Sequence, residues 1–338
     1  MKKLAILMLL AACGEETIPE PPAPSARQQS IRGVKDYVAS NLDELAGAAE
    51  RLCAAAPEES WAEHPDAVME MRRHWETARD AYERIEGAIA MLFPHLDVST
   101  DERYDGFIAV RRDRDLFDGE GVTGMHAIER ILWADAHPEV VLRFEQSLSG
   151  YRPAERPEDR DQAQTFRTGL CQRLLDDTEQ MKSEFEPLAL DPAAAYRGVI
   201  GSIEEQFEKV SLAGTGEDES RYADRTIADM RANLEGGVAI FETFEPWLQE
   251  HEDGPRAQAA VREGFAELQA EYARIEGEAL PPVPAEWNPS DPSPEHLETP
   301  YGQLFALVNR HADPDQEGLL QAMLEGADVL DIAILPRQ

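Results

Sequence analysis

Apolar side chains recur three and four residues apart along almost the whole chain, and this spacing restricts the fold more than any other feature. Val34, Val38, Leu42 and Leu45, for example, lie on one face of a helix. No segment shows the strict alternation of a half-buried strand. The sequence therefore predicts an all-α protein. Further helices are predicted near residues 60–93, 125–137, 138–149, 158–186, 192–212, 218–250, 255–279, 300–311 and 314–333.

Two polar breaks interrupt the helical pattern in the body of the chain. The segment SGYRPAERPEDRD covers residues 149–161, and a proline-rich loop that no helix can cross covers residues 279–300. A chain of 338 residues is long enough for one large or two medium domains. We therefore predict two helical bundles of the four-helix type in tandem, covering residues 31–155 and 156–338.

The N-terminus has the features of an export signal. Two lysines precede a nine-residue apolar run that is too short to span a bilayer as a helix, and the run ends in LAAC. This order resembles a bacterial lipobox, in which Cys13 is lipidated. We predict a signal peptide over 1–12 and a flexible tether over 13–30. The expected location is the periplasmic side of a membrane, and Gly14 after the cysteine favours the outer membrane.

Two further cysteines, Cys53 and Cys171, follow the tether. In the oxidising compartment that an exported protein enters, they could form a disulfide. They could equally be two buried thiols, and the sequence does not decide between these alternatives. Because there is no CxxC spacing, a thiolate metal site is not predicted.

The charge balance limits the partners of the chain. It has 67 acidic and 32 basic residues, for a net charge of −35. Such a surface repels nucleic acid and anionic headgroups and attracts cations, so we expect no nucleic-acid partner and membrane contact through the lipid anchor only. No segment after residue 12 is apolar enough to cross a membrane, so the chain is not expected to form a channel.

Two predicted helices each carry a pair of metal-ligating residue types three positions apart, which places the pair on one helix face. They are His126 with Glu129, and Glu83 with Glu86. Oxygen and nitrogen donors from facing helices suit iron, manganese or zinc better than Cu(I). The alternative is that these are solvated charges, paired with neighbouring arginines. The segment between the two helices is rich in acidic residues, namely Asp97, Asp101 and Asp105.

Several segments resemble the imelysin-like family, which includes the periplasmic EfeO/EfeM-type proteins of bacterial iron uptake. GMHAIERILW, residues 124–133, resembles the family's GxHxxE motif. Residues 78–97 followed by DERYDGF are similar to the segment that precedes this motif, and residues 209–237 resemble a segment of the second half.

The resemblance implies an exported, all-helical, two-bundle protein that binds iron or a similar divalent ion, with zinc as the alternative. His126 and Glu129 correspond to the motif pair, and Glu83, Glu86 and Asp105 fall in segments that supply co-ligands. An inner-membrane iron permease or another uptake component is the implied recipient of the metal. Three residues of the second-half segment either line the same cleft or hold helices together, and we favour the structural role: Asp224, Asp229 and Asn233.

Two other function classes stay open. Imelysin itself is assigned to the metallopeptidases, but Ala127 and Arg130 stand where the HExxH and HxxEH motifs require other residues. We therefore expect a binding protein without catalytic residues rather than an enzyme. The second alternative is an interaction protein of the outer membrane that binds no metal.

Overall fold

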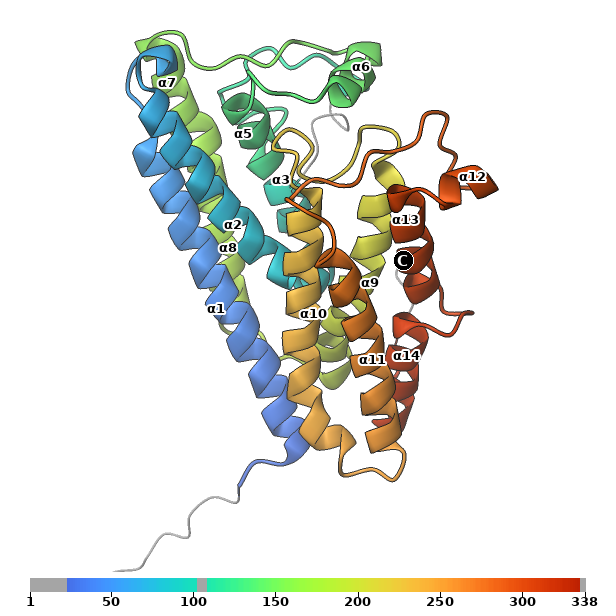
Figure 1. Cartoon of the computed structure of the whole chain (residues 1–338). Helices are drawn as coiled ribbons and strands as arrows, with labels where there is room; N and C mark the ends of the chain where they lie inside the picture. Colours follow the sequence, from blue (N-terminus) through green and yellow to red (C-terminus); the bar gives the residue numbers. More distant parts are fainter. Residues whose placement is uncertain (1–22, 102–107, 335–338) are drawn as a thin grey trace, which may run out of the picture.

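The computed structural model describes residues 23–101 and 108–334. In these residues it contains helices and no strand, which confirms the all-α prediction (Figure 1). A 3₁₀ turn, Trp61–Glu63, precedes the second helix, and a π-helical turn, Arg167–Cys171, joins α7 to α8. The helices are α1 (Ala26–Ala55), α2 (Pro65–Leu92), α3 (Pro94–Asp101), α5 (Gly124–Leu132), α6 (Glu139–Ser147), α7 (Arg160–Phe166), α8 (Gln172–Phe185), α9 (Pro192–Leu212), α10 (Thr226–Leu248), α11 (Gly254–Tyr272), α12 (Pro294–Leu297), α13 (Pro300–Ala312) and α14 (Leu319–Val329).

The long helices lie roughly side by side, and the first two contact both halves of the chain. Helices α1 and α2 pack on each other, and both also pack on α9 and α10. Helix α8 lies against α1, while α11, α13 and α14 lie on the far side of α9 and α10 (Figure 1). Contacts therefore cross the predicted boundary near residue 155, and the division into two tandem bundles stays a prediction.

The predicted apolar faces form the core. Val38 and Leu45 of α1 are fully buried, as are Tyr82 and Ile89 of α2. Between α2 and α9 the backbones approach so closely that a Cβ on Gly87 would lie 2.6 Å from the backbone nitrogen of Ser202. Only glycine allows this approach, and it holds the carboxylate-bearing turn of α2 against α9.

Several helix boundaries differ from the sequence prediction, and two helices end early, α5 at Leu132 rather than near 137 and α11 at Tyr272 rather than near 279. Helix α1 begins at Ala26, inside the predicted tether, because the Ser25 side chain accepts from the Gln28 backbone and Gln28 reaches back to Ser25. Residues 94–101 form α3 rather than a loop, since this segment packs on α5 and α8. Helix α10 begins at Thr226 rather than near 218.

The two cysteines after the tether are joined. Cys53 near the end of α1 and Cys171 in the π-helical turn form a disulfide with a Cα–Cα distance of 5.6 Å. The structure thereby decides the alternative that the sequence left open. The bridge fixes α1 to the start of α8, on which it also packs.

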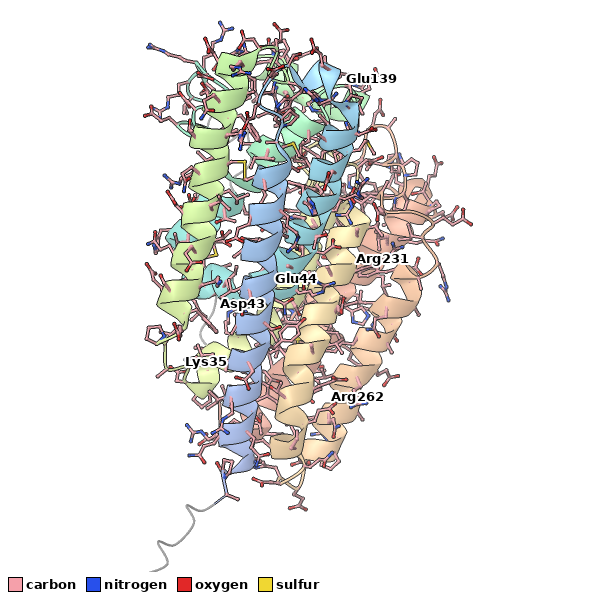
Figure 2. All side chains as sticks on the ribbon, turned by 90° about the vertical axis from the view of Figure 1, so that its left-hand side faces the viewer. Lys35, Asp43, Glu44, Glu139, Arg231 and Arg262 are labelled. Carbon is pink, nitrogen blue, oxygen red and sulfur yellow. A yellow bond between two sulfur atoms is a disulfide. The ribbon has the colours of Figure 1, made fainter. Side chains whose placement is uncertain are left out.

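Charged side chains cover the outer face of α1 and its neighbours. Asp43 and Glu44 point away from the core in the middle of α1 (Figure 2). Lys35 donates to the carbonyl oxygens of Glu186 and Leu188 at 2.7 Å each, and so caps the end of α8. Within the part of the chain that the structure describes, no helix combines the length and apolar character needed to cross a bilayer.

Candidate metal centre

The glycine that opens the motif helix places its histidine. Gly124 has a φ of +79°, and a Cβ at this position would lie 2.4 Å from the carbonyl oxygen of Thr100. Helix α5 can therefore begin directly against the end of α3. As a result, His126 Nε2 lies 3.3 Å from Asp101 Oδ1, at the last residue of α3.

Glu129 orients this histidine. Its Oε2 lies 2.7 Å from His126 Nδ1, and because an ionised carboxylate only accepts, Nδ1 carries the proton. Its Oε1 accepts from the backbone N–H groups of Tyr222 and Ala223 at 2.9 and 2.8 Å. Both oxygens of Glu129 therefore have partners, and the side chain ties the loop before α10 to the motif helix. His126 Nε2 is left to face the acidic residues.

Glu219 of that loop completes a group of three potential ligands. Its Oε1 lies 3.2 Å from His126 Nε2. One ligand atom each of Asp101, His126 and Glu219 lies within 4.8 Å of the others. His126 and Glu219 are buried, and the Asp101 side chain is 13% exposed. A neutral imidazole with two carboxylates is a donor set that suits iron, manganese or zinc.

Two carboxylates of α2, those of Glu83 and Glu86, lie close to the same loop residue, Glu219. Ligand atoms of Glu83, Glu86 and Glu219 also lie within 4.8 Å of one another. Lys209 of α9 contacts all three, with its Nζ 2.9 Å from Glu86 Oε2. Arg79, one turn before Glu83, pairs with Glu83 and donates to Glu219 Oε1 at 2.6 Å.

Negative charge exceeds positive charge in this cluster. Six carboxylates surround two basic side chains, Arg79 and Lys209, and the imidazole of His126. Buried charges without partners are costly, so the cluster favours the uptake of cations or protons. The six are Glu83, Glu86, Asp101, Glu129, Glu219 and Asp229.

Burial and the excess of carboxylates also shift the pKa values of groups in this cluster. Burial raises the pKa of Glu83 well above its ordinary value, and it raises the pKa of Glu86 as well. Burial on its own lowers the pKa of an imidazole, but the carboxylates around His126 outweigh burial and raise its pKa. The site thus holds protons that a metal ion would displace.

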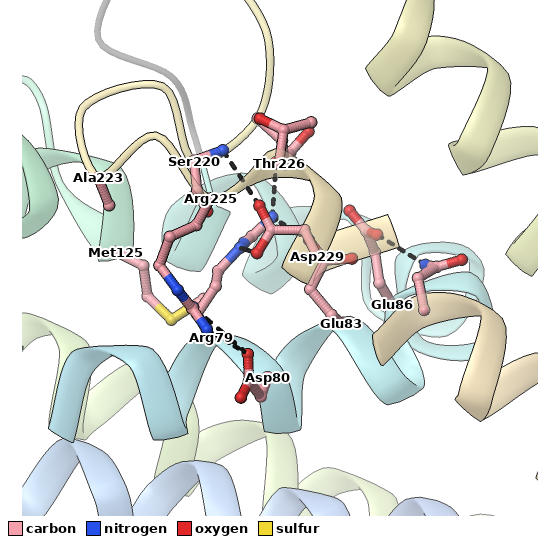
Figure 3. A network of polar contacts seen from close by, with 12 residues as sticks. Arg79, Asp80, Glu83, Glu86, Met125, Ser220, Ala223, Arg225, Thr226 and Asp229 are labelled. Atoms are coloured by element: carbon pink, nitrogen blue, oxygen red, sulfur yellow. Dashed lines mark hydrogen bonds and ion pairs between the residues drawn. The ribbon is translucent and has the colours of Figure 1, made fainter. Parts of the chain in front are cut away.

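Two carboxylate oxygens in the cluster lack a hydrogen-bond donor. Glu83 Oε2 and Asp229 Oδ1 are buried and have no hydrogen-bond partner among the described residues. The other oxygen of Asp229 accepts from the Ser220 backbone N–H at 3.2 Å, while Oδ1 lies 3.7 Å from Arg79 Nε (Figure 3). Within the same described residues, Arg79 Nε is likewise buried without a hydrogen-bond partner, so it and Asp229 Oδ1 face each other as an ion pair. Glu83 Oε2 is then the acceptor that a cation could satisfy.

The structure places the predicted site residues as follows. His126, Glu83 and Glu86 contribute to the two ligand groups, and Glu129 lies behind His126. Asn233 donates to Glu86 Oε2 at 3.0 Å and Asp229 borders Arg79, so both belong to this network. Asp224 is exposed in the loop at a φ of +57°, and is in neither ligand group. Asp105 and Cys13 lie outside the described residues.

Sequence reasoning did not single out Asp101, Glu219 and Lys209 as members of this cluster. Arg79 entered only through the alternative that the glutamates of α2 pair with neighbouring arginines; the structure confirms its pairing with Glu83, but both side chains are buried rather than solvated. Asp101 was only one of several acids in its segment, and Glu219 lies in the glycine-rich acidic stretch GTGEDES. Arg79 and Lys209 look like ordinary surface residues of amphipathic helices. A basic residue one turn before Glu83 was the available signal for Arg79. Nothing local marks Lys209, because its partners come from α2 and from the loop after α9.

Comparisons with known proteins place most of this chain in one family. The family model described as Imelysin matches residues 31–325. The iron uptake system component EfeM of Bacillus subtilis is 27% identical over 197 residues, which is 58% of this chain and 40% of the relative. The chain thus spans less than half of that protein. An Efem/EfeO family lipoprotein of Staphylococcus haemolyticus is 24% identical over 275 residues, 78% of this chain and 80% of the relative. The EfeM of Pseudomonas syringae is 23% identical over 222 residues, 66% of this chain and 62% of the relative.

Proposed function

The chain belongs to the imelysin family, and from this membership we propose that it is an exported, lipid-anchored protein that captures iron for uptake. Asp101, His126 and Glu219 bind the ion. Glu83 and Glu86 supply the adjoining negative charge, and Glu129 holds the imidazole in the metal-binding tautomer. Asp105, which follows α3 in sequence, is a further candidate ligand.

One observation supports this proposal most directly. A buried histidine presents its Nε2 to two carboxylates, within a cluster where acids outnumber bases. A purely structural network would be expected to balance its charges, because uncompensated buried charge is destabilising. A bound cation removes the imbalance. Displacement of the Nε2 proton by the metal makes capture dependent on pH.

Iron is the proposed cargo because two of the relatives are named as iron uptake components. The mixed oxygen and nitrogen donors suit Fe²⁺ or Fe³⁺, and zinc is the alternative ion. The metal content of the natively exported protein tests this proposal. An excess of iron over zinc and manganese supports it, and a protein purified without any metal contradicts it.

Replacement of His126 with Ala tests the site itself. We expect a marked loss of affinity for Fe²⁺ and Zn²⁺ by calorimetry, with the helical content unchanged in circular dichroism. His311→Ala is the matched control, because His311 is also buried and contacts the carboxylate of Glu267, yet lies in neither ligand group. If the His126 variant binds as tightly as the native protein, the metal site lies elsewhere.

The proposal also includes a lipid anchor and a protein that receives the metal. The sequence ending at Cys13 resembles a lipobox, and relatives are named as lipoproteins. We propose attachment to the periplasmic side of a membrane, preferentially the outer membrane, and transfer of the metal to an inner-membrane iron permease or another uptake component. Replacement of Cys13 with Ala should release the protein from membrane fractions. Continued membrane association would contradict lipidation at this residue.

A further inference from the structure

Glu219 belongs to two adjoining ligand groups through different oxygens. Its Oε1 lies 3.2 Å from His126 Nε2, and its Oε2 lies 3.4 Å from Lys209 Nζ. The first group contains Asp101 and His126, and the second contains Glu83 and Glu86. This is the arrangement of a carboxylate that bridges two neighbouring cation positions, as in sites that hold two metal ions about 4 Å apart.

Both positions face a basic side chain, but in different ways. Arg79 contacts the two carboxylates of the first group, Asp101 and Glu219, and not the imidazole, whereas the ammonium group of Lys209 contacts all three carboxylates of the second. Its Nζ lies 2.9 Å from Glu86 Oε2, 3.3 Å from Glu83 Oε1 and 3.4 Å from Glu219 Oε2. The side chain is 1% exposed. It donates a hydrogen bond to Glu86 and forms ion pairs with Glu83 and Glu219. Unlike a surface lysine, this one has its charge fixed inside the cluster.

We propose that Lys209 permanently occupies the second of two bridged metal positions. The native chain then binds one divalent ion, at Asp101, His126 and Glu219, and a second ion can bind at Glu83, Glu86 and Glu219 once the ammonium group is removed. This inference rests on the proposed metal-binding function, and it defines the stoichiometry of the site.

A second observation indicates that the basic side chains present do not satisfy Glu83 completely. Glu83 Oε2 is buried and has no hydrogen-bond partner among the described residues, although the other oxygen of the same carboxylate contacts both Lys209 and Arg79. An ammonium group has only three donors and one charge. A divalent ion accepts more oxygen ligands, and both oxygens of one carboxylate can bind it.

The surroundings of Glu86 also resemble those of a metal ligand. Asn233 donates to Glu86 Oε2 at 3.0 Å, Gln206 donates to Asn233 Oδ1 at 2.9 Å, and Tyr272 donates to Gln206 Oε1 at 2.7 Å. This chain of buried hydrogen bonds fixes the carboxylate from behind. Outer partners of this kind orient carboxylate ligands in metal sites.

The test compares metal stoichiometry in two variants of the full chain with Mn²⁺ as the probe. Lys209→Ala removes the charge and opens space, whereas Lys209→Met removes the charge but fills the space. We expect one Mn²⁺ per native chain, two per Lys209→Ala chain and one per Lys209→Met chain. Electron paramagnetic resonance should show exchange coupling only in the alanine variant, because only there do two ions share Glu219. Lys182→Ala, which removes a surface lysine, is the control and should bind one Mn²⁺ per chain, as the native protein does.

The outcomes separate the two proposals. A native chain without bound Mn²⁺ refutes the metal-binding function. One ion in both the native and the alanine chain refutes only the role of Lys209, and two ions in the native chain refute it as well. If Lys209→Ala does not fold without metal, Mn²⁺ should restore its folding with two ions bound. If Mn²⁺ does not restore folding, the proposed role of Lys209 is refuted. The double variant Lys209→Ala with Glu86→Gln loses one positive and one negative charge. It should therefore fold and bind one Mn²⁺ per chain.

Discussion

Replacement of Glu129 with Gln tests whether this residue acts by orienting His126. In the native site Glu129 accepts from His126 Nδ1 at 2.7 Å through one oxygen and from two backbone N–H groups through the other. A glutamine has only one acceptor oxygen. If that oxygen faces the backbone, the amide NH₂ faces Nδ1, and the neutral imidazole moves its proton to Nε2. If the glutamine oxygen faces Nδ1 instead, the amide NH₂ faces the backbone N–H groups of Tyr222 and Ala223, which are also donors.

Each arrangement weakens metal binding. A proton on Nε2 blocks the nitrogen that faces Asp101 and Glu219, and donor–donor contacts loosen the loop that carries Glu219. Loss of an outer-shell partner typically lowers metal affinity by about 10- to 100-fold. This corresponds to about 1.4–2.8 kcal/mol of binding free energy. Titration calorimetry with Zn²⁺ measures the change in affinity, and ¹⁵N NMR of labelled histidine shows which nitrogen carries the proton.

Glu145→Gln is the matched control for this experiment. Glu145 is another fully buried carboxylate, bound by Arg130 and by the hydroxyl of Tyr222, and it contacts neither His126 nor a ligand group. Its replacement should lower stability and leave the Zn²⁺ affinity unchanged. If Glu129→Gln binds Zn²⁺ as tightly as the native chain, with the proton still on Nδ1, the orienting role is refuted.

Three further predictions concern the fold and its response to pH. Replacement of Cys53 and Cys171 with Ser should lower the free energy of unfolding by about 2–5 kcal/mol in denaturant titrations, because the bridge closes a long loop; an unchanged midpoint would contradict this. Gly87→Ala should cost about 1–3 kcal/mol in thermal unfolding, since the new Cβ would meet the Ser202 backbone at 2.6 Å; equal stability would show that α2 and α9 can separate freely. Because the pKa of His126 is raised and the metal displaces its proton, metal affinity should fall by about tenfold per pH unit below that pKa, starting above the ordinary value near 6.5. An affinity that is constant down to pH 5 would exclude His126 as a ligand.

Local signals were sufficient to predict most helices. Helix α9 has the predicted bounds, because Asp191 caps its first turn and Pro192 occupies its first position. The start of α10 could not be predicted in this way. Residues 218–225 have a composition compatible with a helix, but the backbone N–H groups of Tyr222 and Ala223 donate to Glu129, more than 90 residues earlier. A tertiary contact therefore overrides the local preference.

The candidate site shows the same division between local and distant information. The spacing of His126 and Glu129 predicts that they are neighbours on one helix, and the structure confirms that contact. His126 faces the acidic residues and Glu129 lies behind it because of the positions of α3 and of the loop before α10. Helix periodicity does not position these two segments. Asp101 and Glu219 could be recognised as partners of His126 only once α5 had been placed against α3 through Gly124.

The large negative charge of the chain does not by itself create the site. Most of its 67 acidic residues are exposed, as Glu139 is, and at physiological ionic strength the field of an exposed charge is screened within about 8 Å. Exposed acids raise the concentration of every cation near the surface, without selecting one. Inside the cluster the screening is weaker and the geometry is fixed, so Glu219 and its neighbours interact strongly with an ion of suitable size and charge. Selectivity therefore depends on the few buried acids, and on Arg79 and Lys209, which determine how much positive charge the cluster still requires.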